Sequence, residues 1–334
     1  MQEILGLVRR CVEDYDMIQS GDTVAVGVSG GKDSLVTLTA LARLSKFYQK
    51  PFKVVAITVE TGVPGMSFDA VADYCAALGV EYIRVNVPIY EIVFLERKEK
   101  NPCSLCAKMR RGALHAAAKE MGCTSVALGH HFDDAVETFM MNLFNEGRIA
   151  CFSPVTYLSN TGLYLIRPML FVPEKQIRYF AARADLPVVA SKCPANGNTE
   201  RENMKQLLHT LEREHKGIKH RIFGAMERGE VDGFKAMCRT TNDKNERRKT
   251  DEDFNDRQRQ MGYLYHLVPR QHRAHGQAVR SRRHAAYAGT ACHAVKRDGN
   301  APRERGAGLR YSRACRCGRD RHLGALAGAA RADG

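Results

Sequence analysis

The stretch Val24-Ala-Val-Gly-Val-Ser-Gly-Gly-Lys-Asp-Ser34 (VAVGVSGGKDS) decides how this chain folds. Its first five residues are apolar or small, as in a strand that is buried on both faces. Two glycines, a lysine, an aspartate and two serines follow directly. Glycines let backbone N–H groups approach an anion, and a helix that begins there adds the positive end of its dipole. The stretch predicts a strand, a phosphate-binding loop and a helix that begins at Asp33 or Ser34.

Two common phosphate-binding loops do not match these residues. A Walker A loop needs glycine at position 26 and serine or threonine at position 33, where this chain has Val26 and Asp33. The dinucleotide fingerprint needs glycine at 29 and 32, where this chain has Ser29 and Lys32. Asp33 is unusual beside an anion and indicates that a metal ion, typically Mg²⁺, accompanies the phosphates. An ordinary glycine-rich turn is the remaining alternative.

Strand and helix signals alternate along the first two thirds of the chain. Apolar runs predict strands over 24–28, 52–59, 80–87, 124–129 and 163–167, and apolar residues at helical spacing predict helices near the N-terminus, from about residue 35, and over 67–78, 107–121, 135–145, 199–215 and 218–229. This order is typical of an α/β fold with a doubly wound parallel sheet. Ligands of such sheets bind at the carboxyl ends of the strands.

Charge is distributed unevenly. The net charge is +14, but residues 239–334 hold 22 Lys and Arg against 10 Asp and Glu, which leaves 29 against 27 in residues 1–238. The last third is rich in Arg, Ala, Gly and His without a period, so we expect it to be disordered. It is either a basic RNA-binding tail or a segment without selected function, such as the product of a shifted reading frame.

The chain shows no sign of a membrane or secreted protein. No apolar run approaches the roughly 18–20 residues of a membrane helix, and charged residues interrupt the N-terminal apolar positions, unlike in a signal peptide. We therefore expect a cytoplasmic protein. Its 11 cysteines are then expected to be thiols or metal ligands and not disulfides.

Two cysteines stand three residues apart in Asn101-Pro-Cys103-Ser-Leu-Cys106, just before a predicted helix. Two thiolates at this spacing can bind one metal, and a helix N-terminus lowers a thiol pKa. The pair could be half of a zinc site, a redox pair or a pair without function. A second close pair, Cys315 and Cys317, falls in the basic tail.

Three carboxylates follow the fourth predicted strand. The stretch Ala127–Thr138 reads ALGHHFDDAVET, and Asp133, Asp134 and Glu137 lie within about one turn of a helix start. Carboxylates at a helix N-terminus interact favourably with the helix dipole, and this stabilisation alone would account for them. They also suit a role in facing Mg²⁺ or orienting a substrate, because this end of the strand lies at the same sheet edge as the phosphate loop.

Together these motifs resemble a known family over roughly residues 1–235. SGGKDS after a first strand resembles the PP-loop ATP pyrophosphatases, which cleave ATP between its α- and β-phosphates and use the AMP half to activate an oxygen. GHHFDDAVET resembles their second signature. The pair Cys103 and Cys106, followed by Cys193 in a Lys-Cys-Pro setting, resembles the TtcA-type tRNA 2-thiocytidine synthetases.

The resemblance implies a set of site residues. It implies ATP binding by Ser29, Gly30, Gly31, Lys32, Asp33, Ser34, Thr58 and Gly129, catalytic roles for Lys32, Asp33, Asp133 and Asp134, a [4Fe–4S] cluster on Cys103, Cys106 and Cys193, and Mg²⁺ at Asp33. In that family one iron of the cluster has no protein ligand.

We expect the chain to have four parts: an N-terminal helix (1–20), the ATP-binding α/β domain (21–190), a helical segment with the third cysteine (191–238) and the tail (239–334).

The implied function is ATP-dependent tRNA thiolation, in which the C2 oxygen of a cytidine is adenylated and replaced by sulfur. The implied partners are tRNA and a sulfur donor such as a cysteine desulfurase. A homodimer and the absence of a membrane partner are further expectations. The alternatives are a PP-loop adenylating enzyme without a cluster, a nucleotide-binding iron–sulfur redox sensor, and an RNA-binding protein that acts through its tail.

Overall fold

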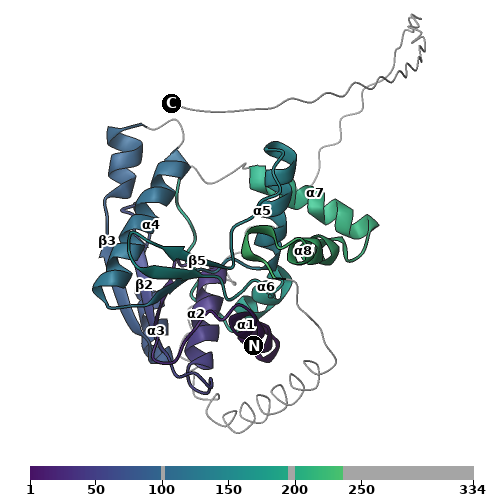
Figure 1. Ribbon diagram of the computed structural model, residues 1–334. Helices are drawn as coiled ribbons and strands as arrows, with labels where there is room; N and C mark the ends of the chain where they lie inside the picture. The colour runs from purple at the N-terminus through teal and green to yellow at the C-terminus, as the bar shows by residue number, and fades with distance from the viewer. Residues whose placement is uncertain (99–101, 195–199, 236–334) are drawn as a thin grey trace, which may run out of the picture. The chain divides into compact units, whose positions relative to one another are not determined.

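A six-stranded sheet forms the centre of the computed structural model, which describes residues 1–98, 102–194 and 200–235 (Figure 1). The strands run in the order β3-β2-β1-β4-β6-β5, and all neighbours are parallel except β5 and β6. Their bounds are β1 Thr23–Gly27, β2 Lys53–Glu60, β3 Glu81–Asn86, β4 Ser125–Ala127, β5 Val155–Leu158 and β6 Leu163–Ile166. The prediction of a doubly wound, mainly parallel sheet is confirmed.

Eight α-helices connect and cover these strands in the described part of the chain. They are α1 Gln2–Asp14, α2 Lys32–Leu44, α3 Asp69–Leu78, α4 Pro102–Glu120, α5 Phe132–Asn145, α6 Glu174–Arg183, α7 Glu200–Glu214 and α8 Ile218–Arg228. A π-helical turn, Glu91–Glu96, and a 3₁₀ turn, Val231–Gly233, complete the set. None of the helices described is long and apolar enough to cross a membrane.

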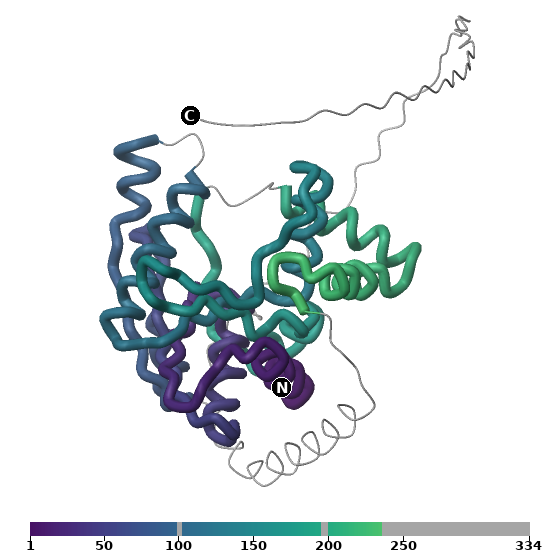
Figure 2. The backbone as a smooth tube through the Cα atoms, in the orientation of Figure 1, coloured from purple at the N-terminus to yellow at the C-terminus, as the bar shows by residue number. Residues whose placement is uncertain are grey.

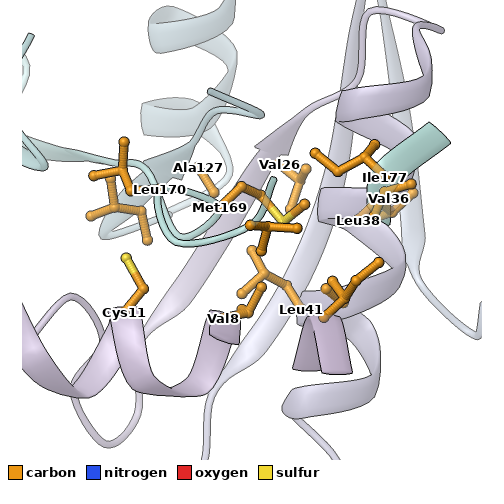
Figure 3. Close-up of a cluster of buried hydrophobic side chains, with 14 of the residues drawn as sticks. Val8, Cys11, Val26, Val36, Leu38, Leu41, Ala127, Met169, Leu170 and Ile177 are labelled. Atoms are coloured by element: carbon orange, nitrogen blue, oxygen red, sulfur yellow. The ribbon is translucent and has the colours of Figure 1, made fainter. Parts of the chain in front are cut away.

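Most helices pack on one face of the sheet. Leu38 and Leu41 of α2 and Val8 of α1 are fully buried, and they meet Val26 of β1 and Ile177 of α6 in one cluster (Figure 3). Burying a Leu or Val side chain contributes about 1.5–3 kcal/mol, so this layer accounts for much of the driving force of folding. It holds α2, and with it the phosphate loop, firmly against the strands.

The other face is covered mainly by α4. Leu114 and Ala118 of α4 are buried against Ala25, Val55 and Val126 of the central strands. Because α4 connects the parallel strands β3 and β4, it runs back across the sheet and begins at the carboxyl edge of the strands. The start of α4, which carries the Cys-x-x-Cys pair, therefore lies at the edge where ligands bind.

The last two described helices lie far from α5 in sequence but beside it in space. α7 and α8 both pack on α5, as the tube in Figure 2 shows for the green and teal segments. Met204 and Leu208 of α7 and Phe223 of α8 are buried in the same core as α1 and α2. Helices α7 and α8 thus pack on the side of α5 and complete this part of the core.

The structure corrects two sequence predictions. The helix after the phosphate loop begins at Lys32, one residue before its predicted start, so Asp33 and Ser34 lie inside it. The helix that follows the cysteine pair begins at Pro102, so Cys103 and Cys106 lie within its first five residues and not before it. The predicted tail, residues 239–334, lies outside the described residues, and the four predicted parts of the chain stay a prediction.

Candidate active site

The phosphate loop leaves β1 at Gly27 and enters α2 at Lys32. Gly30 has φ +80°, and a Cβ there would lie 2.8 Å from Val189 Cβ and 3.0 Å from the Phe68 ring. Only glycine fits this position without strain or a shift of its neighbours. The Val189 N–H donates to the Gly30 carbonyl at 2.9 Å, so the segment that follows α6 is hydrogen-bonded to the phosphate loop.

The two serines of the loop bond within it. The Ser34 hydroxyl donates to the Gly31 carbonyl at 2.8 Å and accepts from the Ser29 N–H at 3.2 Å. The Ser29 hydroxyl lies 3.3 Å from Ser34 Oγ. These bonds fix the curvature of the loop at the N-terminus of α2, where the helix dipole favours an anion.

Lys32 is held between two carboxylates. Its Nζ lies 3.0 Å from an Asp33 oxygen and 3.2 Å from Glu174 Oε1, and the other Glu174 oxygen lies 2.9 Å from Lys205 Nζ. Burial opposes ionisation of Glu174, but Lys205 and Lys32 outweigh it and lower the pKa of Glu174 to about 2. Glu174 therefore joins the loop, the start of α6 and the side of α7.

Asp33 Oδ1 provides a position for a cation. The atom is buried and has no hydrogen-bond partner within the described residues, although Lys32 Nζ forms an ion pair with it. His131 Nε2 lies 3.8 Å away. A carboxylate oxygen left without a hydrogen bond beside a phosphate loop fits a hard cation such as Mg²⁺.

Gly129, at the end of β4, lies against the first turn of α2. A Cβ at this position would be 3.0 Å from the Asp33 carbonyl carbon and 3.1 Å from the Ser34 nitrogen. The absence of a side chain therefore lets the end of β4 approach the phosphate loop. Thr58 is buried, and its hydroxyl donates to the Val28 carbonyl at 2.8 Å, so its side chain ties β2 to the strand before the loop.

Asp133 is bound by protein donors through both oxygens. Oδ2 accepts the backbone N–H of Glu174 at 2.8 Å, and Oδ1 accepts Lys219 Nζ at 2.7 Å. Burial opposes ionisation of Asp133, but these two donors outweigh it and lower the pKa of the carboxyl. In this structure the carboxylate joins the starts of α5, α6 and α8.

Asp134 is also fully engaged. It forms a capping box with His131, in which the His131 N–H donates to Asp134 Oδ2 at 3.0 Å and the Asp134 N–H donates to His131 Nδ1 at 3.3 Å. Its other oxygen lies 3.0 Å from Arg201 of α7. Glu137, one turn later, lies 3.7 Å from the same guanidinium, and burial followed by the charge of Asp134 raises the pKa of Glu137 to about 7.

The three cysteines of the predicted cluster lie toward one edge of the sheet. Cys103 and Cys106 begin α4, and Cys193 follows Val189, which bonds to the loop. Lys192, next to Cys193, lies 2.8 Å from the position of a Cβ on Gly65 in the loop after β2. Within residues 1–98, 102–194 and 200–235, however, no three His, Cys, Asp or Glu side chains are close enough to hold a metal ion.

The donor chemistry of these cysteines nevertheless fits an iron–sulfur cluster. All three are free thiols and none is buried. Three other cysteines, Cys11, Cys75 and Cys123, are buried, and burial raises the pKa of each. Thiolates at least partly open to solvent are the ligands that such clusters use.

Several residues of this edge were not identified from the sequence. Four of them are Glu174, Arg201, Lys205 and Lys219, which lie on α6, α7 and α8. The spacing of Arg201 and Lys205, four residues apart, places both on one helix face. Nothing in the sequence indicated that this face meets the carboxylates of α5.

Comparisons with known proteins identify the family of this fold. A PP-loop domain model matches residues 7–211. The chain is 36% identical over 228 residues to a tRNA-cytidine(32) 2-sulfurtransferase of Geobacter sulfurreducens, covering 67% of this chain and 89% of that one. It is 38% identical over 222 residues to the Pelobacter propionicus protein of the same name, with 66% and 82% covered.

A solved structure shows the same fold with related chemistry. The U34-tRNA thiolase NcsA from Methanococcus maripaludis, solved with its [4Fe–4S] cluster, superposes with a TM-score of 0.55 at 30% identity, covering 66% of this chain and 76% of that one. The matched range of the family model, residues 7–211, includes the phosphate loop, the stretch Ala127–Thr138 and all three cysteines. The chain belongs to the PP-loop family and, within it, to the tRNA-cytidine(32) 2-sulfurtransferases.

Proposed function

We propose that this chain is an ATP-dependent tRNA sulfurtransferase that replaces the C2 oxygen of a tRNA cytidine with sulfur. The observation that carries the proposal is the placement of a PP-loop and three free, unburied cysteines toward one edge of the sheet. The relatives are named for cytidine 32, and we propose the same position as the target here.

The first step is adenylation of the target oxygen. The cytidine O2 attacks the α-phosphorus of ATP, a new O–P bond forms, and the bond to the β-phosphate oxygen breaks with release of pyrophosphate. The N–H groups of Gly30 and Gly31, the dipole of α2 and Lys32 bind the departing phosphates. Asp33 would hold Mg²⁺ beside them, and the ion would add positive charge where negative charge develops.

Lys32 needs a particular position for this role. Glu174 keeps its ammonium beside the loop before ATP arrives, since the two groups lie 3.2 Å apart. Asp133 and Asp134 do not contact the reacting atoms in this proposal. Asp133 holds the first turns of α6 and α8, and Asp134 holds the guanidinium of Arg201. Preorganised charges of this kind stabilise a transition state without reorganisation during the reaction.

The second step replaces the activated oxygen. Sulfur attacks C2, a C–S bond forms, and the C2–O bond breaks so that AMP leaves with the original oxygen. Cys103, Cys106 and Cys193 are the residues that would hold a [4Fe–4S] cluster. When bound, the cluster supplies an iron without a protein ligand as the site for the incoming sulfide. A cysteine desulfurase as sulfur donor and a homodimer belong to the same proposal.

The test compares protein purified without oxygen with a Cys103→Ala, Cys106→Ala, Cys193→Ala variant. We expect about four irons and equal sulfide per wild-type chain, and nucleoside mass analysis of the tRNA should show one oxygen exchanged for sulfur. The triple variant should lose both. Cys151→Ala, which removes another unburied thiol, should keep both. Wild-type protein without iron that still releases AMP would replace this proposal with adenylation that does not use a cluster.

A further inference from the structure

A cluster beside the phosphate loop has no part in the function described so far. His130 follows Gly129 at the end of β4, and Arg167 follows β6, the neighbouring parallel strand. The Arg167 Nε–H donates to His130 Nδ1 at 3.2 Å, and its guanidinium also donates to the Ser153 carbonyl. Both side chains lie on the ring of Phe152, with the His130 ring centroid 4.9 Å away and Arg167 Cζ 4.8 Å away.

This arrangement assigns the position of the imidazole proton. A guanidinium only donates hydrogen bonds, so the His130 nitrogen that accepts from it, Nδ1, carries no proton. The neutral ring then has its proton on Nε2. Burial and the charge of Arg167 lower the pKa of His130 to about 4, which keeps the ring neutral at physiological pH. His130 is therefore a hydrogen-bond donor of fixed orientation.

The donor atom is open. Within the described part of the chain no residue bonds to His130 Nε2, and this nitrogen is not among the buried atoms that lack a partner. The other ring nitrogen and the ring face are both occupied, which fixes the direction of Nε2–H. A fixed and accessible donor at the edge where substrates bind indicates a ligand that accepts a hydrogen bond.

Position on the sheet indicates which ligand this is. ATP is expected to lie over the end of β1, where the phosphate loop is found, and toward β2, which carries Thr58, one of the residues that the resemblance implies for ATP binding. His130 and Arg167 lie on the opposite side of the loop, at the ends of β4 and β6. The tRNA, which is the second substrate, is therefore expected to bind on the β4 and β6 side of the loop.

We propose that His130 donates its Nε2–H to the acceptor edge of the target cytosine and selects cytidine against uridine. The assignment rests on the proposed function. N3 of cytosine is an acceptor beside O2, whereas N3 of uracil carries a proton. A fixed donor opposite that proton would leave two buried donors unpaired, which disfavours uridine. A hydrogen bond to N3 also draws electrons from C2, the carbon that receives sulfur.

The first test uses single-turnover AMP release with tRNA that carries cytidine or uridine at the target position. His130→Leu should slow release with cytidine by about 10- to 100-fold, the loss of one buried hydrogen bond, and reduce the preference over uridine about tenfold. Its affinity for ATP should change less than about threefold. His130→Gln should recover most of the rate and preference, because its amide also presents an N–H at that distance. His209→Gln, an exposed histidine of α7, is the matched control.

The second test is independent of activity. Nitrogen-15 NMR of histidine-labelled protein should show His130 with its proton on Nε2 and without titration between pH 5.5 and 8.5. A proton on Nδ1, titration in that range, a normal rate in His130→Leu, or an equal loss of ATP affinity would each overturn the assignment. Wild-type protein that thiolates no tRNA would overturn the proposed function itself, a result that the tautomer measurement does not depend on.

Discussion

Lys219 Nζ lies 2.7 Å from Asp133 Oδ1, although 86 positions separate the two residues. The second Asp133 oxygen accepts the N–H of Glu174. One buried carboxylate thus fixes the first turns of α5, α6 and α8, and the position of α8 beside the active-site edge depends on it.

Asp133→Asn should therefore destabilise the protein. Removing one partner of a buried pair leaves the other charge without compensation, at a cost of about 3 kcal/mol. Urea unfolding should show this loss, and Lys219→Met should lose a comparable amount because it leaves the buried Asp133 carboxylate without its cation. The double variant should lose clearly less than the sum of the two. Simple additivity would mean that the pair contributes nothing as a pair.

Gly129→Ala should weaken ATP binding strongly. The new methyl group would lie 3.0 Å from the Asp33 carbonyl carbon, a backbone atom that can move only with the loop. Titration calorimetry with ATP should show an affinity lower by more than about tenfold, and the folded state should survive. Gly112→Ala is the control, because Gly112 lies in α4 with nothing within 4 Å of its added Cβ. That variant should bind ATP normally and gain up to about 1 kcal/mol of stability.

Glu174→Gln should remove an acid-dependent part of the stability. The pKa of Glu174 is about 2 in the folded protein, against an ordinary value of 4.5. The stabilisation from its ion pairs is present above pH 4.5 and is lost as the pH falls toward 2. The variant should be less stable than wild type by about 2 kcal/mol at pH 7 and should approach it at pH 3. Glu120→Gln, an exposed position at the end of α4, should show no such trend.

Glu137→Gln should have the opposite dependence. Burial, with the charge of Asp134, raises the pKa of Glu137 to about 7. The folded protein then holds a proton that the unfolded chain releases above pH 4.5, so wild-type stability falls as the pH rises from 4.5 through 7. The variant carries no such proton and should be more stable than wild type at pH 8.5, by at most about 3 kcal/mol. Wild type and Glu137→Gln should have similar stability at pH 4.5. A stability difference that stays constant at all pH values would contradict the raised pKa of Glu137.

The sheet and the phosphate loop could be predicted because their signals are local. Residues 24–34 contain both the apolar strand and the glycines that leave it, and each later parallel strand is an apolar run of its own. Strand β5 and helix α6 were not predicted. β5 is a four-residue antiparallel edge strand, and only Ile177 and Ala181 of the hydrophobic residues in α6 are buried, which gives a weak pattern.

The contacts of the site could not be predicted in the same way. Asp133 and Asp134 were identified, but their partners Lys219 and Arg201 come from helices 67 to 86 positions later. Ion pairs of this kind depend on how amphipathic helices pack together. The sequence does not distinguish a Lys or Arg of α7 or α8 that pairs with α5 from one that faces solvent. The tautomer of His130 likewise depends on Arg167, which only the pairing of β4 with β6 brings close.

The order in which these charges are synthesised has a consequence for folding on the ribosome. Asp133, Asp134, Glu137 and Glu174 leave the exit tunnel before Arg201, Lys205 and Lys219, the cations that pair with them. A chain that ends at β6 contains Asp133, Asp134 and Glu137 but not the cations of α7 and α8 that pair with them, and we expect these uncompensated carboxylates to disfavour a nucleotide beside them. We therefore expect ATP to bind tightly only after α7 and α8 have emerged, so that unfinished chains bind it weakly.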